Sequence, residues 1–327
     1  MRKILNENLP ILTENWEGNP LDAEGRYKNL HGKSEKTYKD LFKWQLSKNP
    51  FRKHKKNQKT NVEVLKNSDF LSDKRNGFTW LGHATFVFTL NEKNIIIDPV
   101  FGKIGPLKRY TEFPCSPTDL IYIDIILLSH NHRDHLDEKS IKQLCNRNPQ
   151  AVIYTTLGIS KLLRNWSIKN EIIEAGWYQQ FKEIAGINIS LVPSKHWSRR
   201  GLFDLNEMLW GGFMIQAANH CLYFAGDSGI DDHFTQIGKL FPKIDYAFIG
   251  IGAYEPNWFM RDSHTNPAEA VECQRMLKAS KLFPMHYGTF DLSDEPIFLP
   301  KEALQDIMNK EELANIIFGT IGKKVLL

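Results

Sequence analysis

The chain has 327 residues, of which 42% are apolar and 24% charged, with eight tryptophans and a formal net charge of +4. This composition is typical of a soluble globular protein and excludes a disordered or fibrous chain. The first residues turn polar at once, and no stretch reaches the roughly 18 apolar residues of a membrane span. We therefore expect a cytoplasmic protein without a signal peptide.

The positive charge is concentrated near the N-terminus. Residues 1–76 carry a net charge of +7, whereas residues 77–327 carry −3. The densest part is the basic run 52–59, which fits two interpretations: peripheral contact with phosphates or an anionic membrane surface, or a solvated connecting segment. Nucleic-acid binding through this run is a remote alternative, because it requires steeply salt-dependent affinity and the rest of the chain offers no extended basic face.

Residues 1–76 mix proline, glycine, asparagine and charge, with one expected short helix over 38–46. We interpret them as an extension packed on a main domain formed by residues 77–327. From Phe78 onward, expected strands alternate with expected helices, which is an α/β pattern whose natural assembly is two facing sheets with helices outside. The expected strands cover 86–90, 95–97, 121–128, 151–154, 187–192, 208–215, 221–224 and 246–251.

Local signals mark two helix starts. Asp137 is suited to the N-cap of one helix, and Asn266, Pro267 and Glu269 have the pattern of a capping box at another. The four cysteines are far apart and form no C-x-x-C pair, which favours reduced core thiols over disulfides or a thiolate zinc site. They are Cys115, Cys145, Cys221 and Cys273.

The strongest chemical signal follows the apolar stretch 125–128. His130, His132, Asp134 and His135 form an H-x-H-x-D-H pattern within six residues. Neutral imidazole and carboxylate are ligands that zinc, iron and manganese accept, and a strand end lets a rigid sheet fix their geometry. Satisfying these groups by hydrogen bonds alone within one loop would be costly. The pattern therefore predicts a metal site.

This pattern resembles the signature of the metallo-β-lactamase superfamily, whose fold is a four-layer αββα sandwich. The resemblance implies a third histidine, a bridging aspartate and a last histidine downstream, and the chain offers His196, Asp227 and His286 in that order, each after an expected strand. The implied ligands of a first divalent ion are His130, His132 and His196, those of a second are Asp134, His135 and His286, and Asp227 bridges them. Zn²⁺ suits this set best, with Mn²⁺ and iron as alternatives.

The resemblance also implies a binuclear hydrolase in which residues 77–327 are the catalytic domain and a metal-bridging hydroxide is the nucleophile. Segments 80–85 and 97–101 resemble the first hairpin of such hydrolases. Within them, His83 and Asp98 are expected either to orient metal ligands or to serve structural roles.

Segments 195–200, 252–260 and 286–290 look like those of N-acyl-phosphatidylethanolamine-hydrolysing phospholipases D. This likeness implies a phosphodiesterase that acts on a related lipid, with Asp134 and His264 as catalytic residues. For His264 the alternative is a surface histidine near a helix cap. Several apolar side chains are expected near the ligand loops, where they would either bind an acyl chain or only pack: Trp197, Tyr254, Trp258, Phe259 and Met260.

A second functional hypothesis keeps the two metals but takes a lactone, rather than a phosphodiester, as the bond that is hydrolysed. Lactonases resembling the ascorbate-phosphate lactonase group share a first segment of the Trp-Leu-Gly-His type and the same pattern of metal ligands. Phosphodiesters and lactones have transition states of different shape and charge, so turnover of the two substrate classes separates the hypotheses. In either case the expected partner is a small molecule or a lipid rather than a nucleic acid.

Overall fold

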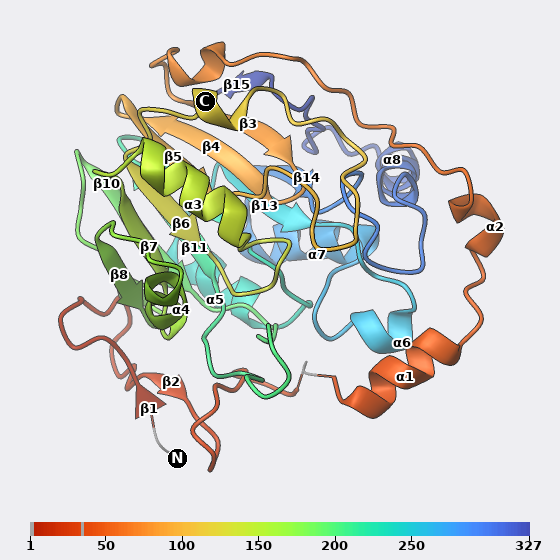
Figure 1. Ribbon diagram of the computed structural model, residues 1–327, viewed down its shortest axis with the longest axis horizontal. Coiled ribbons are helices and arrows are strands. Elements are labelled where there is room, and N and C mark those ends of the chain that lie inside the picture. The colour runs from red at the N-terminus through yellow and green to blue at the C-terminus, as the bar shows by residue number, and fades with distance from the viewer. Residues whose placement is uncertain (1–2, 34–35) are drawn as a thin grey trace.

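The computed structural model describes residues 3–33 and 36–327, and its two large β-sheets lie face to face between layers of helices (Figure 1). The first sheet has the order β15-β3-β4-β5-β6-β7-β8. Its strands are β3 (Gly77–Gly82), β4 (Thr85–Leu90), β5 (Lys93–Ile97), β6 (Ile125–Leu128), β7 (Val152–Thr156), β8 (Ile172–Ala175) and β15 (Lys324–Leu326).

The second sheet has the order β14-β13-β12-β11-β10-β9. Its strands are β9 (Gln179–Gln180), β10 (Ile187–Val192), β11 (Gly212–Ala217), β12 (His220–Phe224), β13 (Tyr246–Gly250) and β14 (Lys281–Met285). The helices of this part of the chain are α3 (Glu138–Arg147), α4 (Ile159–Asn165), α5 (His233–Leu240), α6 (Asn257–Met260), α7 (Pro267–Leu277) and α8 (Leu299–Glu311).

Strand periodicity explains the layers. In β6, Ile125 and Leu127 belong to the core between the sheets, whereas Ile126 and Leu128 pack with Ile141 of α3. Alternate residues of a strand point to opposite faces, so a strand that is apolar at every position is covered on both sides. The predicted four-layer αββα sandwich is therefore confirmed.

Aromatic side chains fill the space between the sheets. The ring of Phe78 in β3 lies 4.8 Å from that of Phe248 in β13 and 5.1 Å from that of Phe283 in β14. Both contacts have the edge-to-face geometry that aromatic quadrupoles favour. This packing locks the two sheets together beneath the loops that follow their strands.

Two expected strands differ from the observed ones by several residues. The strand expected over 121–128 begins only at Ile125, because Tyr122 has a φ of +63° and is exposed. The strand expected over 208–215 is displaced to Gly212–Ala217, because Leu209 donates to the carbonyl of Leu157 instead of pairing in the sheet. A left-handed backbone conformation therefore set the first boundary, and a backbone hydrogen bond outside the strand pattern set the second.

The predicted helix starts are confirmed. Asp137 accepts a hydrogen bond from the amide of Ser140 at the start of α3, and Asn266 and Glu269 form a capping box at α7. The four cysteines are free thiols. Over the stretches 3–33 and 36–327, no helix combines the length and the apolar character needed to cross a bilayer.

The N-terminal residues form small elements around the edge of the molecule in the view of Figure 1. These elements are β1 (Lys3–Ile4), β2 (Asn19–Pro20), α1 (Tyr38–Leu46) and α2 (Arg52–Lys55). The helix predicted over 38–46 is confirmed as α1, which begins with a capping box at Thr37. α1 lies beside α6, where the rings of Trp44 and Phe259 are 4.8 Å apart. The division of the chain at residue 76 stays a prediction.

Candidate metal centre

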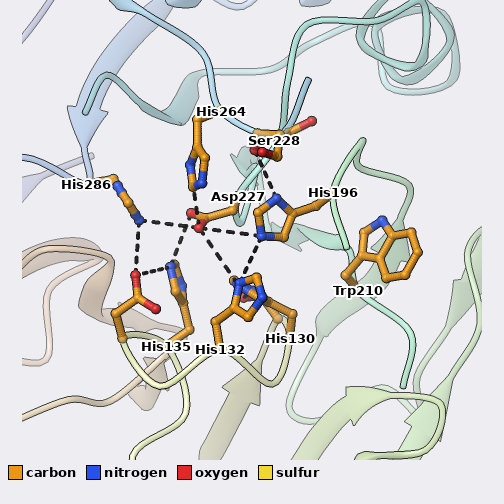
Figure 2. A network of polar contacts seen from close by, with 12 residues as sticks. His130, His132, His135, His196, Trp210, Asp227, Ser228, His264 and His286 are labelled. Atoms are coloured by element: carbon orange, nitrogen blue, oxygen red, sulfur yellow. Dashed lines mark hydrogen bonds and ion pairs between the residues drawn. The ribbon is translucent and has the colours of Figure 1, made fainter. Parts of the chain in front are cut away.

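Four strand ends bring the predicted metal ligands together. His130, His132, Asp134 and His135 follow β6, whereas the others follow β10, β12 and β14 of the second sheet. β10, β12 and β14 run in the same direction, so their carboxyl ends meet at one edge. Figure 2 shows that the labelled histidines converge on Asp227. Every ligand residue predicted from the sequence therefore lies in one buried cluster.

The first group of potential ligands contains His130, His132, His196 and Asp227, whose ligand atoms lie within 4.8 Å of one another. His132 Nδ1 is 3.1 Å from His130 Nε2 and 3.0 Å from His196 Nε2. Nitrogen atoms about 2.0–2.1 Å from a tetrahedral ion would be about 3.3 Å apart. The observed spacing of these three nitrogens thus fits a single small divalent ion.

The second group contains Asp134, His135 and His286, together with His83. His286 Nε2 lies 3.4 Å from Asp134 Oδ2 and 3.3 Å from Asp227 Oδ2, and His135 Nε2 lies 3.2 Å from Asp227 Oδ1. The Nε2 atoms of His135 and His286 are buried without a hydrogen-bond partner among the described residues. Buried polar atoms are normally satisfied, and a metal ion would satisfy these. The donor set therefore fits a second ion.

The charges of the three histidines in the first group suit metal binding. Burial, reinforced by neighbouring histidines, lowers the pKa of His130 and His196 well below its usual range, and burial lowers the pKa of His132 to about 4. These imidazoles are therefore neutral at pH 7, and only a neutral imidazole can bind a cation. Burial opposes ionisation of Asp227, but the nearby His135 and His286 hold the pKa of its carboxyl well below its usual range.

The buried carboxylate of Asp98 orients one ligand from behind. Its Oδ2 accepts hydrogen bonds from His135 Nδ1 at 2.8 Å and from Ser129 Oγ at 2.5 Å, and its Oδ1 accepts from the Ser129 amide at 2.8 Å. Such a partner fixes the ring and directs the other nitrogen of His135 toward the metal position. His83 Nε2 similarly lies 3.2 Å from Asp134 Oδ2. The structure thus favours orienting roles for Asp98 and His83.

A cavity of about 750 Å³ opens above the centre, and His132, Asp134, Asp227 and His264 reach it. Its other lining is of two kinds. Apolar side chains include Leu41, Trp44, Leu107, Trp197, Phe259 and Met260, and basic side chains include Lys36, Arg133, Arg199 and Arg200. Of the apolar residues singled out in the sequence, Tyr254 and Trp258 lie outside this lining.

His264 joins the cluster although it belongs to neither set of three ligands predicted above. Its Nδ1 lies 3.8 Å from Asp227 Oδ2, and its ring is 5.2 Å from that of His196. The side chain is 16% exposed and lines the cavity, and its ring points toward Asp227 (Figure 2). His264 therefore lies at the cavity beside Asp227, and its catalytic role stays a prediction.

Sequence reasoning missed the contribution of the N-terminal residues to this site. Lys36, Leu41 and Trp44 line the cavity, and Asn29 forms hydrogen bonds with the main chain of His196. These residue types are ordinary, and their positions show no pattern pointing to a site so distant in the sequence. No signal in the single sequence could have identified them.

Comparison with known proteins places these observations in a family. A family described as "Beta-lactamase superfamily domain" matches residues 93–287, which is more than half of the chain. The chain belongs to the beta-lactamase superfamily. As a member of this superfamily with the metallo-hydrolase fold and buried histidine–aspartate clusters able to hold metal ions, the protein is a metal-dependent hydrolase.

Relatives within the superfamily support a particular branch. The chain is 36% identical to N-acyl-phosphatidylethanolamine-hydrolyzing phospholipase D 1 of Caenorhabditis elegans, over 80% of this chain and 78% of that protein. It is 34% identical to the mitochondrial phospholipase D of the same description from Saccharomyces cerevisiae, over 69% of this chain but only 50% of that protein.

Solved structures support the fold. A metallo hydrolase from Ignicoccus hospitalis has a TM-score of 0.59 and 22% identity, covering 77% of this chain and 98% of that one. An isothiocyanate hydrolase from Delia radicum gut bacteria has a TM-score of 0.63 and 17% identity, covering 76% and 98%. At such low identity the likeness concerns architecture alone, because one fold hosts many reactions.

Proposed function

We propose that this protein is a binuclear phosphodiesterase that acts on an N-acyl-phosphatidylethanolamine-like lipid. The observation that carries the proposal is the position of the histidine–aspartate cluster at the floor of a cavity with an apolar wall and basic side chains. Such a cavity suits a molecule that has an acyl chain and an anionic phosphodiester. The names of the two phospholipase relatives support the same substrate class.

In this proposal His130, His132 and His196 hold one ion, and Asp134, His135 and His286 hold the other. Asp227 lies between the groups, since its carboxylate oxygens approach His135 and His286 on one side and His130 on the other. When bound, two divalent ions, most simply Zn²⁺ with Mn²⁺ or iron as alternatives, supply Lewis acidity and lower the pKa of water. The anionic Asp227 offsets their mutual repulsion.

We assign the catalytic roles to the residues at the cavity floor. Asp134 reaches the cavity while His83 and His286 hold its carboxylate in place. His264 faces the same space, where its ring nitrogen can form a hydrogen bond with a phosphoryl oxygen or the leaving group. A donor placed where negative charge develops stabilises a transition state more than it stabilises the substrate.

The outer surface of α1 favours peripheral contact with a membrane. Tyr38, Phe42 and Leu46 are spaced four residues apart and are 45%, 63% and 86% exposed. Residues four apart share one face of a helix. The opposite side of the same helix lines the cavity through Leu41 and Trp44. A lipid entering the cavity from an anionic bilayer would therefore pass beside this helix. A cytoplasmic location, the prediction from the sequence, is compatible with such contact.

The test measures metal content together with turnover. Wild type should contain two equivalents of metal and cleave N-acyl-phosphatidylethanolamine and bis(p-nitrophenyl) phosphate. Asp227→Ala should lose metal and activity together, whereas Asp306→Ala, an exposed aspartate of α8, should lose neither. Wild type without metal, or metal-loaded protein that cleaves no phosphodiester, would refute the proposal. Turnover of lactones instead would favour the lactonase hypothesis.

A further inference from the structure

Asn29, in the N-terminal residues, contacts the main chain of a potential metal ligand. Its Nδ2 donates to the His196 carbonyl at 2.9 Å, and its Oδ1 accepts from the His196 amide at 3.0 Å. The two residues are 167 positions apart, and both are buried. One side chain thus holds both polar groups of one backbone residue.

These bonds matter because His196 lies beyond the end of β10 at Val192. Its backbone is therefore outside the regular ladder of the sheet, which fixes residues within a strand. A buried backbone donor or acceptor must find a partner, and leaving one unpaired is costly. The Asn29 carboxamide supplies partners for both groups of His196 and thereby fixes the position of its Cα atom.

A second contact fixes the imidazole. His196 Nδ1 donates to the carbonyl of Ser263 at 2.9 Å, which leaves Nε2 directed toward His132, 3.0 Å from its Nδ1. The N-terminal residues also reach this second support, since Lys36 pairs with Asp262 at 2.9 Å next to Ser263. With its backbone and Nδ1 both held, His196 has little freedom to move Nε2.

We propose that Asn29 is a positioning residue for the metal centre, and that the N-terminal extension completes the first metal site through it. The inference rests on the proposed function, because it takes His196 to be a metal ligand. It makes Asn29 of this extension part of the support of the metal centre. Partners that orient metal ligands typically contribute 10–100-fold to metal affinity or activity, and we expect an effect of about this size.

The experiment uses the full-length chain with Asn29→Ala, Asn29→Asp and the control Asn19→Ala. Asn19 is a buried asparagine of the same extension whose Oδ1 accepts from the Trp177 amide at 3.1 Å, away from the ligands. Zn²⁺ affinities are measured by competition with a chromophoric chelator, and the Co²⁺ absorption spectrum reports ligand geometry. Unfolding of the metal-free proteins is measured in parallel.

We expect Asn29→Ala to weaken the binding of one of the two ions about 10–100-fold and to alter the Co²⁺ absorption spectrum. Asn29→Asp keeps the size of the side chain and the oxygen that accepts from the His196 amide, but it places a second oxygen against the His196 carbonyl. It should therefore weaken the binding of the same ion. Asn19→Ala should lower the stability of the metal-free protein and leave both affinities unchanged. This separation distinguishes positioning of a ligand from general loosening of the extension.

Several results would overturn the inference. Wild-type affinities and spectrum in Asn29→Asp would do so even if Asn29→Ala failed to fold, because the aspartate variant preserves the volume of the side chain. Equal loss of metal in Asn19→Ala would assign the effect to general destabilisation. If wild type itself bound no metal, the proposed function would fail first, whereas two tightly bound ions in every variant would refute this inference alone.

Discussion

The ligand loops and the N-terminal extension contribute to the same cavity by different means. Ligands such as His130 and Asp227 directly follow strands whose side chains are almost completely buried between layers. By contrast, no residue of α1 is buried, although Leu41 and Trp44 line the cavity. The comparison shows that the potential metal ligands, whose positions must be fixed accurately, are attached to the buried strands of the core. Part of the wall that would face the substrate belongs instead to a helix without buried residues.

This difference separates the expected effects of mutation. Changes behind the ligand loops should alter metal binding, whereas changes in the extension should alter the use of large substrates and membranes. Asn29 is the proposed exception, because it reaches from the extension to His196. Substitutions on each side of the comparison can sharpen or break it.

The largest of these effects is expected for Asp98→Asn. An amide replaces one carboxylate oxygen with an NH2 group, so it cannot accept from His135 Nδ1, the Ser129 hydroxyl and the Ser129 amide together as the carboxylate does. We expect metal affinity or activity to fall about 10–100-fold, as is usual when the partner of a ligand is lost. Metal titration and kcat should be measured beside Asp124→Asn.

Asp124 is a suitable control because it accepts from the Asn94 amide at 2.9 Å at the other end of the same sheet. Asp124→Asn should change stability only. If Asp98→Asn bound metal as tightly as wild type, His135 would not depend on its buried partner. The contrast between a core-supported centre and a wall formed partly by α1 would then be wrong.

The sequence predicted the core-supported side of this contrast well. The H-x-H-x-D-H pattern places four polar residues directly after an apolar strand, and such a local arrangement can be read without the structure. His196, Asp227 and His286 were reached through the family resemblance, and the structure brings them to the same edge. Asp98 was recognised as a candidate partner, but its hydrogen bonds with Ser129 and His135 needed coordinates.

The extension could not be predicted in the same way. Asn29 and Trp44 act through contacts with residues 167 and 250 positions away, such as His196 and Asp294, and no local periodicity encodes such contacts. The predicted boundary of the strand over 208–215 was wrong for a related reason. The amide of Leu209 donates to the carbonyl of Leu157 rather than to a strand partner. What a single sequence hides here is long-range pairing of ordinary residue types.

A smaller effect is expected for Trp44→Ala. Removing the indole from the cavity wall should raise KM about 10-fold for long-chain substrates, since each methylene in apolar contact contributes about 0.8 kcal/mol. Turnover of bis(p-nitrophenyl) phosphate should not change, because this substrate has no acyl chain. Trp258→Ala is the matched control, since Trp258 lies outside the lining and is 40% exposed. An equal loss of activity on both substrates would instead indicate that Trp44 helps to position the metal centre.

The outer face of α1 should affect only activity on membranes. Phe42→Ser combined with Leu46→Ser should reduce binding to anionic phospholipid vesicles by roughly 10-fold. The substitutions remove two apolar side chains that would otherwise be buried in the bilayer interface. Turnover of detergent-dispersed substrate should be unchanged. Tyr122→Ser, at a residue that is 69% exposed near the start of β6, is the control. Equal vesicle binding by the double variant and wild type would contradict membrane contact through α1.

The smallest expected effect separates the two interpretations of the basic run 52–59. Lys53 is exposed in α2, whereas Lys55 pairs with Asp291 at 2.6 Å. A basic residue near an anionic bilayer contributes about 1 kcal/mol, so Lys53→Ala should weaken vesicle binding about 5-fold at low salt and less at high salt. Lys55→Ala should have a weaker effect on vesicle binding, because its charge is already paired, and should instead lower stability slightly. If neither variant changes vesicle binding, the run is a solvated connection, and membrane contact depends on the apolar face of α1 alone.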